Sequence, residues 1–193
     1  MAKSKIVVMG GGSFGTAIAN ILAENDFQTV LWVRDAEKAS AIQTTRENKT
    51  YLPNLILHNS LQATADMTLA LQDAEIVFVS VPSKVFRSVV QQMRPLLPPN
   101  AIVVSTAKGI ETGENHQGFW LMSDVLKQEL PTHRIAVLSG PNLAGEIAEK
   151  QLTGTVVASS DAAVCQQVQD CLRSPYFRVY SNNDVYGVNW AVY

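Results

Sequence analysis

The chain has 193 residues, of which 47% are hydrophobic and 17% charged, with 15 Lys and Arg against 17 Asp and Glu for a net charge of −2. This length and apolar content are typical of a globular protein with a buried core and exclude a disordered chain. The small net charge offers no electrostatic footprint for nucleic acid or an anionic membrane. No apolar run approaches the roughly 20 residues that cross a bilayer.

Two features predict a cytoplasmic protein. The apolar run at 6–9 is too short for a secretion signal and leads directly into glycines. Cys165 and Cys171 lie six residues apart in an expected helix, where a rise of about 9 Å and a turn of about 240° place them too far apart for a disulfide. We therefore expect both cysteines to be buried, small apolar residues in a reducing compartment.

Short β-branched runs alternate with helical patterns along the whole chain. The runs predict strands at 5–9, 28–33, 76–80, 101–106, 134–138, 155–159 and 177–180. Apolar positions about 3.6 residues apart predict helices at 14–25, 36–46, 83–93, 117–130, 143–150 and 161–173. The least regular stretch, 48–59, is expected to cover a neighbouring crevice.

Several of these strands are apolar without a gap, which is typical of a parallel sheet covered on both faces. The alternation of strands and helices therefore predicts an α/β fold of the Rossmann type, with a doubly wound and mainly parallel sheet. No linker or repeat interrupts the pattern, so we expect one domain over residues 1–193.

A glycine-rich turn follows the first predicted strand and contains the spacing G-x-G-x-x-G at Gly10, Gly12 and Gly15. The first glycine permits a tight turn, the second lets the backbone approach a pyrophosphate, and the third lets the helix pack closely on the sheet. The helix N-terminus adds N–H donors and the positive end of its dipole. Because the pattern follows a strand and opens a helix, it predicts dinucleotide binding.

The end of the second predicted strand bears on which nicotinamide cofactor binds. NAD-preferring sites place an acidic residue there, on the ribose 2′-hydroxyl. This chain has Arg34 at about that place and Asp35 one residue later. Since an arginine can pair with a 2′-phosphate through charge-assisted hydrogen bonds, we favour NADP(H), with NAD(H) as the alternative.

Two further turns lie at strand ends that face the same crevice in such a sheet. Lys108 follows strand 101–106, where a cation can anchor a phosphate or polarise a carbonyl; a lysine that is only exposed is the alternative. The turn at 138–144 follows the next strand and opens a helix, whose free N–H groups would face the crevice.

The sequence lacks the motifs of metal sites, serine hydrolases and P-loop proteins. His58, His116 and His133 are scattered without Cys, Asp or Glu at ligand spacing, so we expect no metal site. Ser139 precedes a glycine but lacks the G-x-S-x-G elbow of serine hydrolases. No Walker lysine follows the glycines, which excludes a P-loop.

Six motifs occur together in order along the chain: Gly10-Gly11-Gly12-Ser13-Phe14-Gly15-Thr16-Ala17, Tyr51-Leu52-Pro53, Val81-Pro82-Ser83, Thr106-Ala107-Lys108-Gly109, Ser139-Gly140-Pro141 and Phe177-Arg178-Val179-Tyr180-Ser181-Asn182. In order and spacing they resemble the bacterial-type NAD(P)-dependent glycerol-3-phosphate dehydrogenases. The resemblance implies reversible hydride transfer between NAD(P)H and dihydroxyacetone phosphate. The product, sn-glycerol 3-phosphate, would serve phospholipid synthesis.

The resemblance also implies roles for single residues. Besides the three glycines, four residues would contact the cofactor: Ser13, Phe14, Arg34 and Ala144. Lys108 would lie between cofactor and substrate, and Gly140 and Asn142 would touch the substrate. The family usually has Ser or Thr where this chain has Asn142, a change that keeps hydrogen-bonding ability but alters reach.

The resemblance stops near the C-terminus. After 184–188 the family continues into a helix with the general acid/base lysine and then an all-helical substrate domain, whereas this chain ends at Tyr193. We therefore expect the catalytic lysine beyond Tyr193 and assign no catalytic residue within the chain. The alternatives are the cofactor domain of another two-domain dehydrogenase and a dinucleotide-binding module without catalysis. Oligomer formation stays open.

We predict that the 193-residue chain alone does not reduce dihydroxyacetone phosphate at a useful rate. Hydride delivery to a ketone leaves an alkoxide that needs a proton, and a positioned general acid typically contributes about 10²- to 10⁴-fold. Oxidation of NADPH, followed by absorbance, checks this against a version extended by the helical domain. Comparable rates would place the proton donor within these residues.

Overall fold

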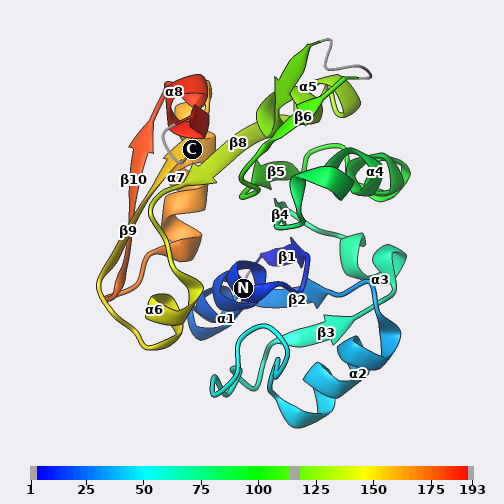
Figure 1. Cartoon of the computed structure of the whole chain (residues 1–193), viewed down its shortest axis with the longest axis vertical. Coiled ribbons are helices and arrows are strands. Elements are labelled where there is room, and N and C mark those ends of the chain that lie inside the picture. The colour runs from blue at the N-terminus through cyan, green and yellow to red at the C-terminus, as the bar shows by residue number, and fades with distance from the viewer. Residues whose placement is uncertain (1–3, 114–117, 191–193) are drawn as a thin grey trace.

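The computed structural model describes residues 4–113 and 118–190. An eight-stranded sheet runs through it in the order β3-β2-β1-β4-β5-β8-β9-β10 (Figure 1). The strands are β1 Lys5–Met9, β2 Gln28–Trp32, β3 Gln62–Thr64, β4 Ile76–Val79, β5 Ile102–Ser105, β8 Arg134–Ser139, β9 Thr153–Ala158 and β10 Phe177–Asn182. Neighbours from β3 to β8 pair in parallel, β9 is antiparallel to β8, and β10 is parallel to β9. The predicted, mainly parallel α/β fold is confirmed.

Helices cover both faces of this sheet (Figure 1). They are α1 Ser13–Glu24, α2 Ala36–Thr45, α3 Met67–Leu71, α4 Ser83–Met93, α5 Met122–Glu129, α6 Ala144–Ala148, α7 Ala162–Leu172 and α8 Val185–Trp190, with a short 3-10 turn at Arg94–Leu96. One core lies under α1, α2, α6 and α7, and the other under α3, α4 and α5. The termini of the described chain fall on opposite halves of the sheet.

The strand sequences explain this two-sided cover. In β1, Ile6 and Val8 belong to the first core, whereas Val7 and Met9 belong to the second, and all four are fully buried. Alternate side chains of a strand point to opposite faces, so a strand with cores on both sides has no polar position. The unbroken apolar runs in the sequence follow from this arrangement.

One predicted helix, 117–130, is wrong at its start. Gln117 lies outside the described residues, and Phe119–Leu121 forms strand β7, which pairs antiparallel with β6, Ile110–Thr112. The helix α5 begins only at Met122. Aromatic residues such as Phe119 and Trp120 suit a strand as well as a helix face, and the pairing with β6 decides between them.

The remaining differences concern short elements. The structure adds β3, α3 and α8 to the predicted elements, and it begins β9 at Thr153 rather than at 155. Short pieces of this kind carry too few periods of a hydrophobic pattern to be recognised alone. Predicted and observed bounds of the other predicted strands differ by at most two residues.

Both cysteines are buried and free, as predicted. Burial raises the pKa of the Cys165 and Cys171 thiols, so each is uncharged at neutral pH. An uncharged, enclosed thiol is a poor nucleophile. Both residues therefore act as packing residues between α7 and the sheet.

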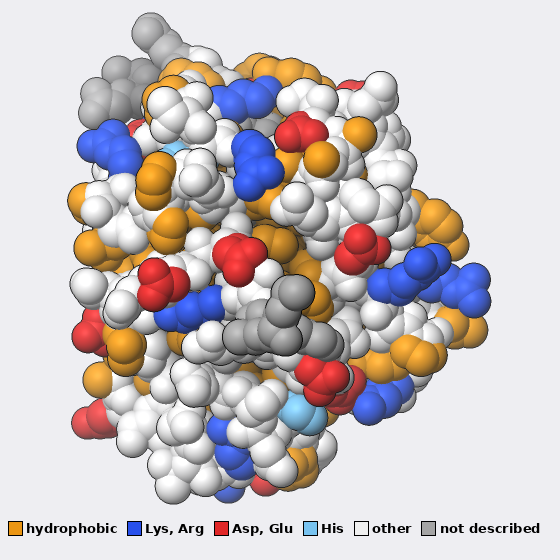
Figure 2. Space-filling model, turned by 180° about the vertical axis from the view of Figure 1, so that it is seen from behind, with side chains coloured by type: hydrophobic (Ala, Val, Ile, Leu, Met, Phe, Trp, Pro, Cys, Tyr) orange, Lys and Arg blue, Asp and Glu red, His pale blue; other side chains and the backbone are white. Residues whose placement is uncertain are grey.

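The surface fits the composition. None of the described helices is long and apolar enough to cross a membrane. On the face seen in Figure 2, Lys and Arg side chains are interspersed with Asp and Glu, and neither sign forms a continuous surface.

A partly buried ion-pair network joins α4, β6 and α5. Arg87 binds Glu111 through Nε and Nη2, at 2.8 and 2.6 Å from Oε2, and donates from Nη1 to Glu129 Oε1 at 2.6 Å. Gln91 and Arg94 also approach the Glu129 carboxylate. Burial acts to raise the pKa of Glu129, but the hydrogen bonds and charges of its partners outweigh it and lower that pKa. The network holds β6, which begins two residues after Lys108.

We predict that Glu129→Gln lowers the free energy of unfolding at pH 7 by roughly 1.5 to 3 kcal/mol, since it removes hydrogen bonds to a charged group. A carboxyl whose pKa is lowered by folding stabilises the protein above its ordinary pKa, and this contribution is lost as pH falls below about 4.3. Urea unfolding across a pH series should therefore show a flatter acid limb for the variant. Glu47→Gln, in an ion pair with the exposed Lys49, is the control. Parallel acid limbs for Glu129→Gln and the wild type would contradict the prediction.

Candidate functional site

The strand order reverses between β1 and β4. From β1 the chain proceeds outward to β2 and β3, and it then returns to β4 on the other side and continues to β5 and β8. In open parallel sheets, ligands bind beyond the carboxyl ends of the strands at such a switch point. Here those ends are the glycine turn after Met9 and the segment from Ser80 after β4.

The glycine turn fits against β4 with no room for side chains. Gly10 has φ +125°, and a Cβ there would lie 2.5 Å from the Ser80 carbonyl oxygen. A Cβ at Gly15 would lie 2.1 Å from the Gly10 carbonyl oxygen. Both contacts are far shorter than real Cβ contacts, so these two positions require glycine for packing.

Gly12 differs, because a Cβ there would meet nothing within 4 Å. Its backbone, φ −73° and ψ 178°, is open to any residue. Gly12 is also the N-cap of α1, whose first turn carries no acidic residue. The first N–H groups of a helix lack intrahelical partners and carry the positive end of the dipole. The open space beside Gly12 therefore fits an anionic group such as a pyrophosphate.

A loop from the irregular stretch 48–59 holds the turn from outside. Asn48, which is 4% exposed, donates from Nδ2 to the Gly11 carbonyl and to Thr16 Oγ1, both at 2.8 Å. The Ser13 hydroxyl donates to the Tyr51 carbonyl at 2.5 Å. This stretch thus contacts the glycine turn through residues 48–51. Asn48 was not among the predicted site residues, because an asparagine at the start of a loop carries no sequence signal that would single it out.

At the end of β2 the two candidate residues differ in their surroundings. Asp35 is the N-cap of α2 and accepts hydrogen bonds from the backbone of Glu37 and Lys38 at 3.0 and 3.1 Å. Its other oxygen lies 4.0 Å from Lys38 Nζ. Arg34 is exposed beside it. The Asp35 carboxylate thus caps α2, whereas the exposed Arg34 side chain is accessible to a ligand.

The turn after β5 forms another wall at the switch point. Thr106 and Ser80 share a hydrogen bond between hydroxyls at 2.5 Å, which ties the ends of β5 and β4 together. Lys108 follows and is exposed. Gly109, at φ +116°, lies against the Ser83 hydroxyl, where a Cβ would be 2.6 Å away. The position of Lys108 is therefore set by packing on both sides.

The turn after β8 is the third wall. Gly140 is buried, and Asn142, 9% exposed, donates from Nδ2 to the Gly154 carbonyl of β9 at 2.8 Å. This hydrogen bond holds the turn to the neighbouring strand. Ala144 begins α6, which packs against α1, and both Ala144 and Phe14 pack on the core beneath α1.

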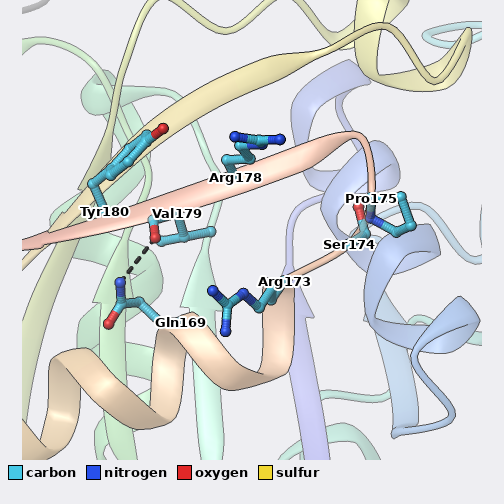
Figure 3. Close-up of a pocket in the computed structure, with 7 residues that line it drawn as sticks. All are labelled: Gln169, Arg173, Ser174, Pro175, Arg178, Val179 and Tyr180. Carbon is cyan, nitrogen blue, oxygen red and sulfur yellow. Dashed lines mark hydrogen bonds between the residues drawn. The ribbon is translucent and has the colours of Figure 1, made fainter.

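A cavity of about 550 Å³ lies elsewhere, at the β10 edge of the sheet (Figure 3). Its lining comes from the end of α7 and from β10: Gln169, Arg173, Ser174, Pro175, Arg178, Val179 and Tyr180. Gln169 donates to the Val179 carbonyl across its floor. None of these seven is a predicted site residue.

The histidines lie apart from the switch point. His58 is exposed and bonds Ser60, and His133 precedes β8 at the opposite end of that strand. His116 lies outside the described residues. Among residues 4–113 and 118–190, His, Cys, Asp and Glu form no group of three that could hold a metal ion.

Comparisons with known proteins agree with this geometry. A family model described as the NAD-dependent glycerol-3-phosphate dehydrogenase N-terminus matches residues 5–165. Proteins named glycerol-3-phosphate dehydrogenase [NAD(P)+] from Teredinibacter turnerae and Alcanivorax borkumensis are each 50% identical, over 95% and 96% of this chain and 53% of their own length. The crystal structure of glycerol-3-phosphate dehydrogenase from Coxiella burnetii is 31% identical with a TM-score of 0.89, covering 98% of this chain and 57% of that one. The chain thus spans about half the length of the relatives it matches.

We predict opposite outcomes for two glycine substitutions. Gly12→Val projects into open space and should lower the free energy of unfolding by no more than about 1 kcal/mol, the usual loss at an N-cap, while it abolishes binding of a dinucleotide. Gly15→Ala should destabilise the fold by about 3 kcal/mol or more, because its Cβ collides with backbone. Thermal unfolding and cofactor titration distinguish the two; a Gly12→Val protein that still binds would exclude the turn as the pyrophosphate site.

Proposed function

The chain belongs to the NAD-dependent glycerol-3-phosphate dehydrogenase N-terminus family, and we propose that it is a single dinucleotide-binding domain that holds NADPH for the reduction of dihydroxyacetone phosphate. The observation that carries this proposal is the open space at Gly12, directly at the N-terminus of α1 and at the reversal of strand order. Family membership supports a nicotinamide cofactor, and the relatives' names give either NAD or NADP.

The cofactor's pyrophosphate would lie over Gly12, with Gly10 and Gly15 giving the turn its shape. The backbone N–H groups that open α1, including those of Ser13 and Phe14, would hydrogen-bond its oxygens. The Ser13 hydroxyl already donates to Tyr51, so its backbone is the part available to a ligand. Ala144, on the helix that packs against α1, would complete the contact with the cofactor.

Arg34 supports a preference for NADPH over NADH. The 2′-phosphate of NADPH needs a cation where NADH would present a hydroxyl to an acid. The only acidic residue directly beside Arg34 at the end of β2 is Asp35, which caps α2 and lies near Lys38. A capping carboxylate would lose those bonds if it turned to the ribose. The arginine has no such constraint.

The substrate would lie between the turns that follow β5 and β8. When bound, the reduced nicotinamide supplies the hydride. The Lys108 ammonium would attract the phosphate or polarise the carbonyl of dihydroxyacetone phosphate. The Gly140 backbone would contact the substrate, and Asn142 would offer Oδ1, since its Nδ2 binds β9.

This activity is proposed for a protein of the relatives' full length, which is about twice the length of this chain. Its product, sn-glycerol 3-phosphate, fits a role in phospholipid synthesis. We further propose a cytoplasmic location, which suits the two free, buried thiols. The proposed function holds equally for a monomer and for an oligomer of this protein.

We predict that the chain binds NADPH by itself and that Arg34→Ala weakens NADPH by roughly 1.5 to 3 kcal/mol, the loss of a hydrogen bond to a charged group. Binding of NADH should change much less, because it has no 2′-phosphate. Calorimetric titration of both cofactors gives the comparison.

Lys38→Ala serves as a control, because it removes a neighbouring cation in the first turn of α2, four residues after Arg34. Equal weakening of NADPH and NADH by Arg34→Ala would refute the cofactor preference but leave the fold assignment intact. Absence of NADPH binding at millimolar concentration would refute the proposed function itself.

A further inference from the structure

The three consecutive glycines of the turn present a physical problem. Glycine loses more conformational freedom on ordering than any other residue. A segment of Gly10, Gly11 and Gly12 is therefore poorly ordered unless something outside it fixes its peptides. A pyrophosphate that had to order the turn on binding would bind weakly, since preorganisation strengthens affinity by removing that cost.

Gly10 is held against Ser80, and α1 begins immediately after Gly12. Packing holds this segment at Gly11 as well, where a Cβ would lie 2.8 Å from Val33 Cγ2, so what a hydrogen bond adds is the direction of a peptide group. The peptide between Gly11 and Gly12 receives its hydrogen bond from a side chain far along the sequence, namely Asn48 Nδ2, which donates to the Gly11 carbonyl at 2.8 Å.

We propose that Asn48 is a positioning residue for the cofactor, which fixes the Gly11–Gly12 peptide in the orientation that binds a pyrophosphate. This inference rests on the proposed function. The peptide group is planar and trans, so its N–H points opposite to its C=O. With the Gly11 carbonyl held toward Asn48, the N–H of Gly12 points away from Asn48. Gly12 itself borders open space, where a pyrophosphate could accept from that N–H.

The geometry around Asn48 supports this role. Its amide nitrogen bridges the turn and the first helix, since the same Nδ2 reaches Thr16 Oγ1 at 2.8 Å, and Thr16 is fully buried in α1. The backbone carbonyl of Asn48 accepts hydrogen bonds from the backbone N–H groups of Leu52 at 2.8 Å and Tyr51 at 3.2 Å. Tyr51 in turn accepts from the Ser13 hydroxyl. Asn48 thus lies in a closed set of hydrogen bonds that leaves it one orientation.

The test compares Asn48→Ala with Asn20→Ala. Asn20 is an equally buried asparagine at 4% exposure that bonds Glu24 and the backbone of His58, away from the turn. The two variants should lose similar stability. ADP carries the pyrophosphate and serves as the probe, beside NADPH. Asn48→Ala should weaken both ligands about 5- to 10-fold, the effect of one net hydrogen bond, whereas Asn20→Ala should leave both unchanged.

Binding of adenosine 2′-monophosphate distinguishes a local defect in the turn from a general loosening of the fold, because a general loosening would weaken this ligand too. It lacks a pyrophosphate, so its affinity in chemical-shift titrations should be the same for Asn48→Ala and the wild type. If Asn48→Ala does not fold, Thr16→Val replaces it: the variant removes one acceptor of Asn48 and should weaken ADP while Thr16→Ser, which keeps the hydroxyl, does not.

Equal losses in both asparagine variants, or an unchanged affinity of Asn48→Ala for ADP, would overturn the role of Asn48. A parallel loss of adenosine 2′-monophosphate would also overturn it, because the defect would not be confined to the turn. Failure of the wild type to bind ADP or NADPH would instead refute the proposed function. The two failures are therefore distinguishable.

Discussion

The close approach of three backbone segments at Gly10 determines the arrangement of this domain. The end of β1, the start of α1 and the end of β4 meet where a Cβ on Gly10 or Gly15 would lie 2.5 or 2.1 Å from a carbonyl oxygen. Only glycine allows α1 to descend directly onto the sheet at this point. Because α1 lies there, its N-terminus opens over the reversal of strand order, and the anion-binding end of the helix coincides with the crevice of the sheet.

The glycines that allow this approach have no side chains to fix the direction of their peptide groups. The structure compensates with hydrogen bonds from elsewhere in the chain, through Asn48 and through the bond between Ser13 and Tyr51. The neighbouring turns are held in a comparable way: Ser80 bonds Thr106, and Asn142 bonds the backbone of β9. The candidate site is thus a group of turns on strand ends, each tied to its neighbour by a buried or half-buried polar side chain. These hydrogen bonds fix the backbone of the turns, while the space beside Gly12 stays open.

The far half of the sheet has a different character. Beyond β8 the direction of the strands reverses, and β9 and β10 carry the chain to α8, which packs on Val137 and Ala158 of the sheet. Several large apolar side chains in this half are exposed, among them Tyr180, Tyr186 and Leu152. The relatives continue for about as many residues again. The glycine turn and Arg34 lie in the other half of the sheet, whereas Lys108 and Ala144 follow β5 and β8.

What the sequence determined by itself is local. The apolar runs, the helical periods and the glycine spacing depend on residues within one or two turns of each other, and strands such as β1 and β4 were predicted almost to the residue. The glycine turn was predicted for the same reason, since strand, turn and helix are consecutive. The tertiary structure decided what depends on partners outside one element: the antiparallel placement of β9 and the pairing of Phe119–Leu121 with β6. Asn48 is the clearest case, because its function lies in two hydrogen bonds to residues 32 and 37 positions away. A polar side chain in a loop has no periodic pattern, and only burial against a specific partner gives it a role.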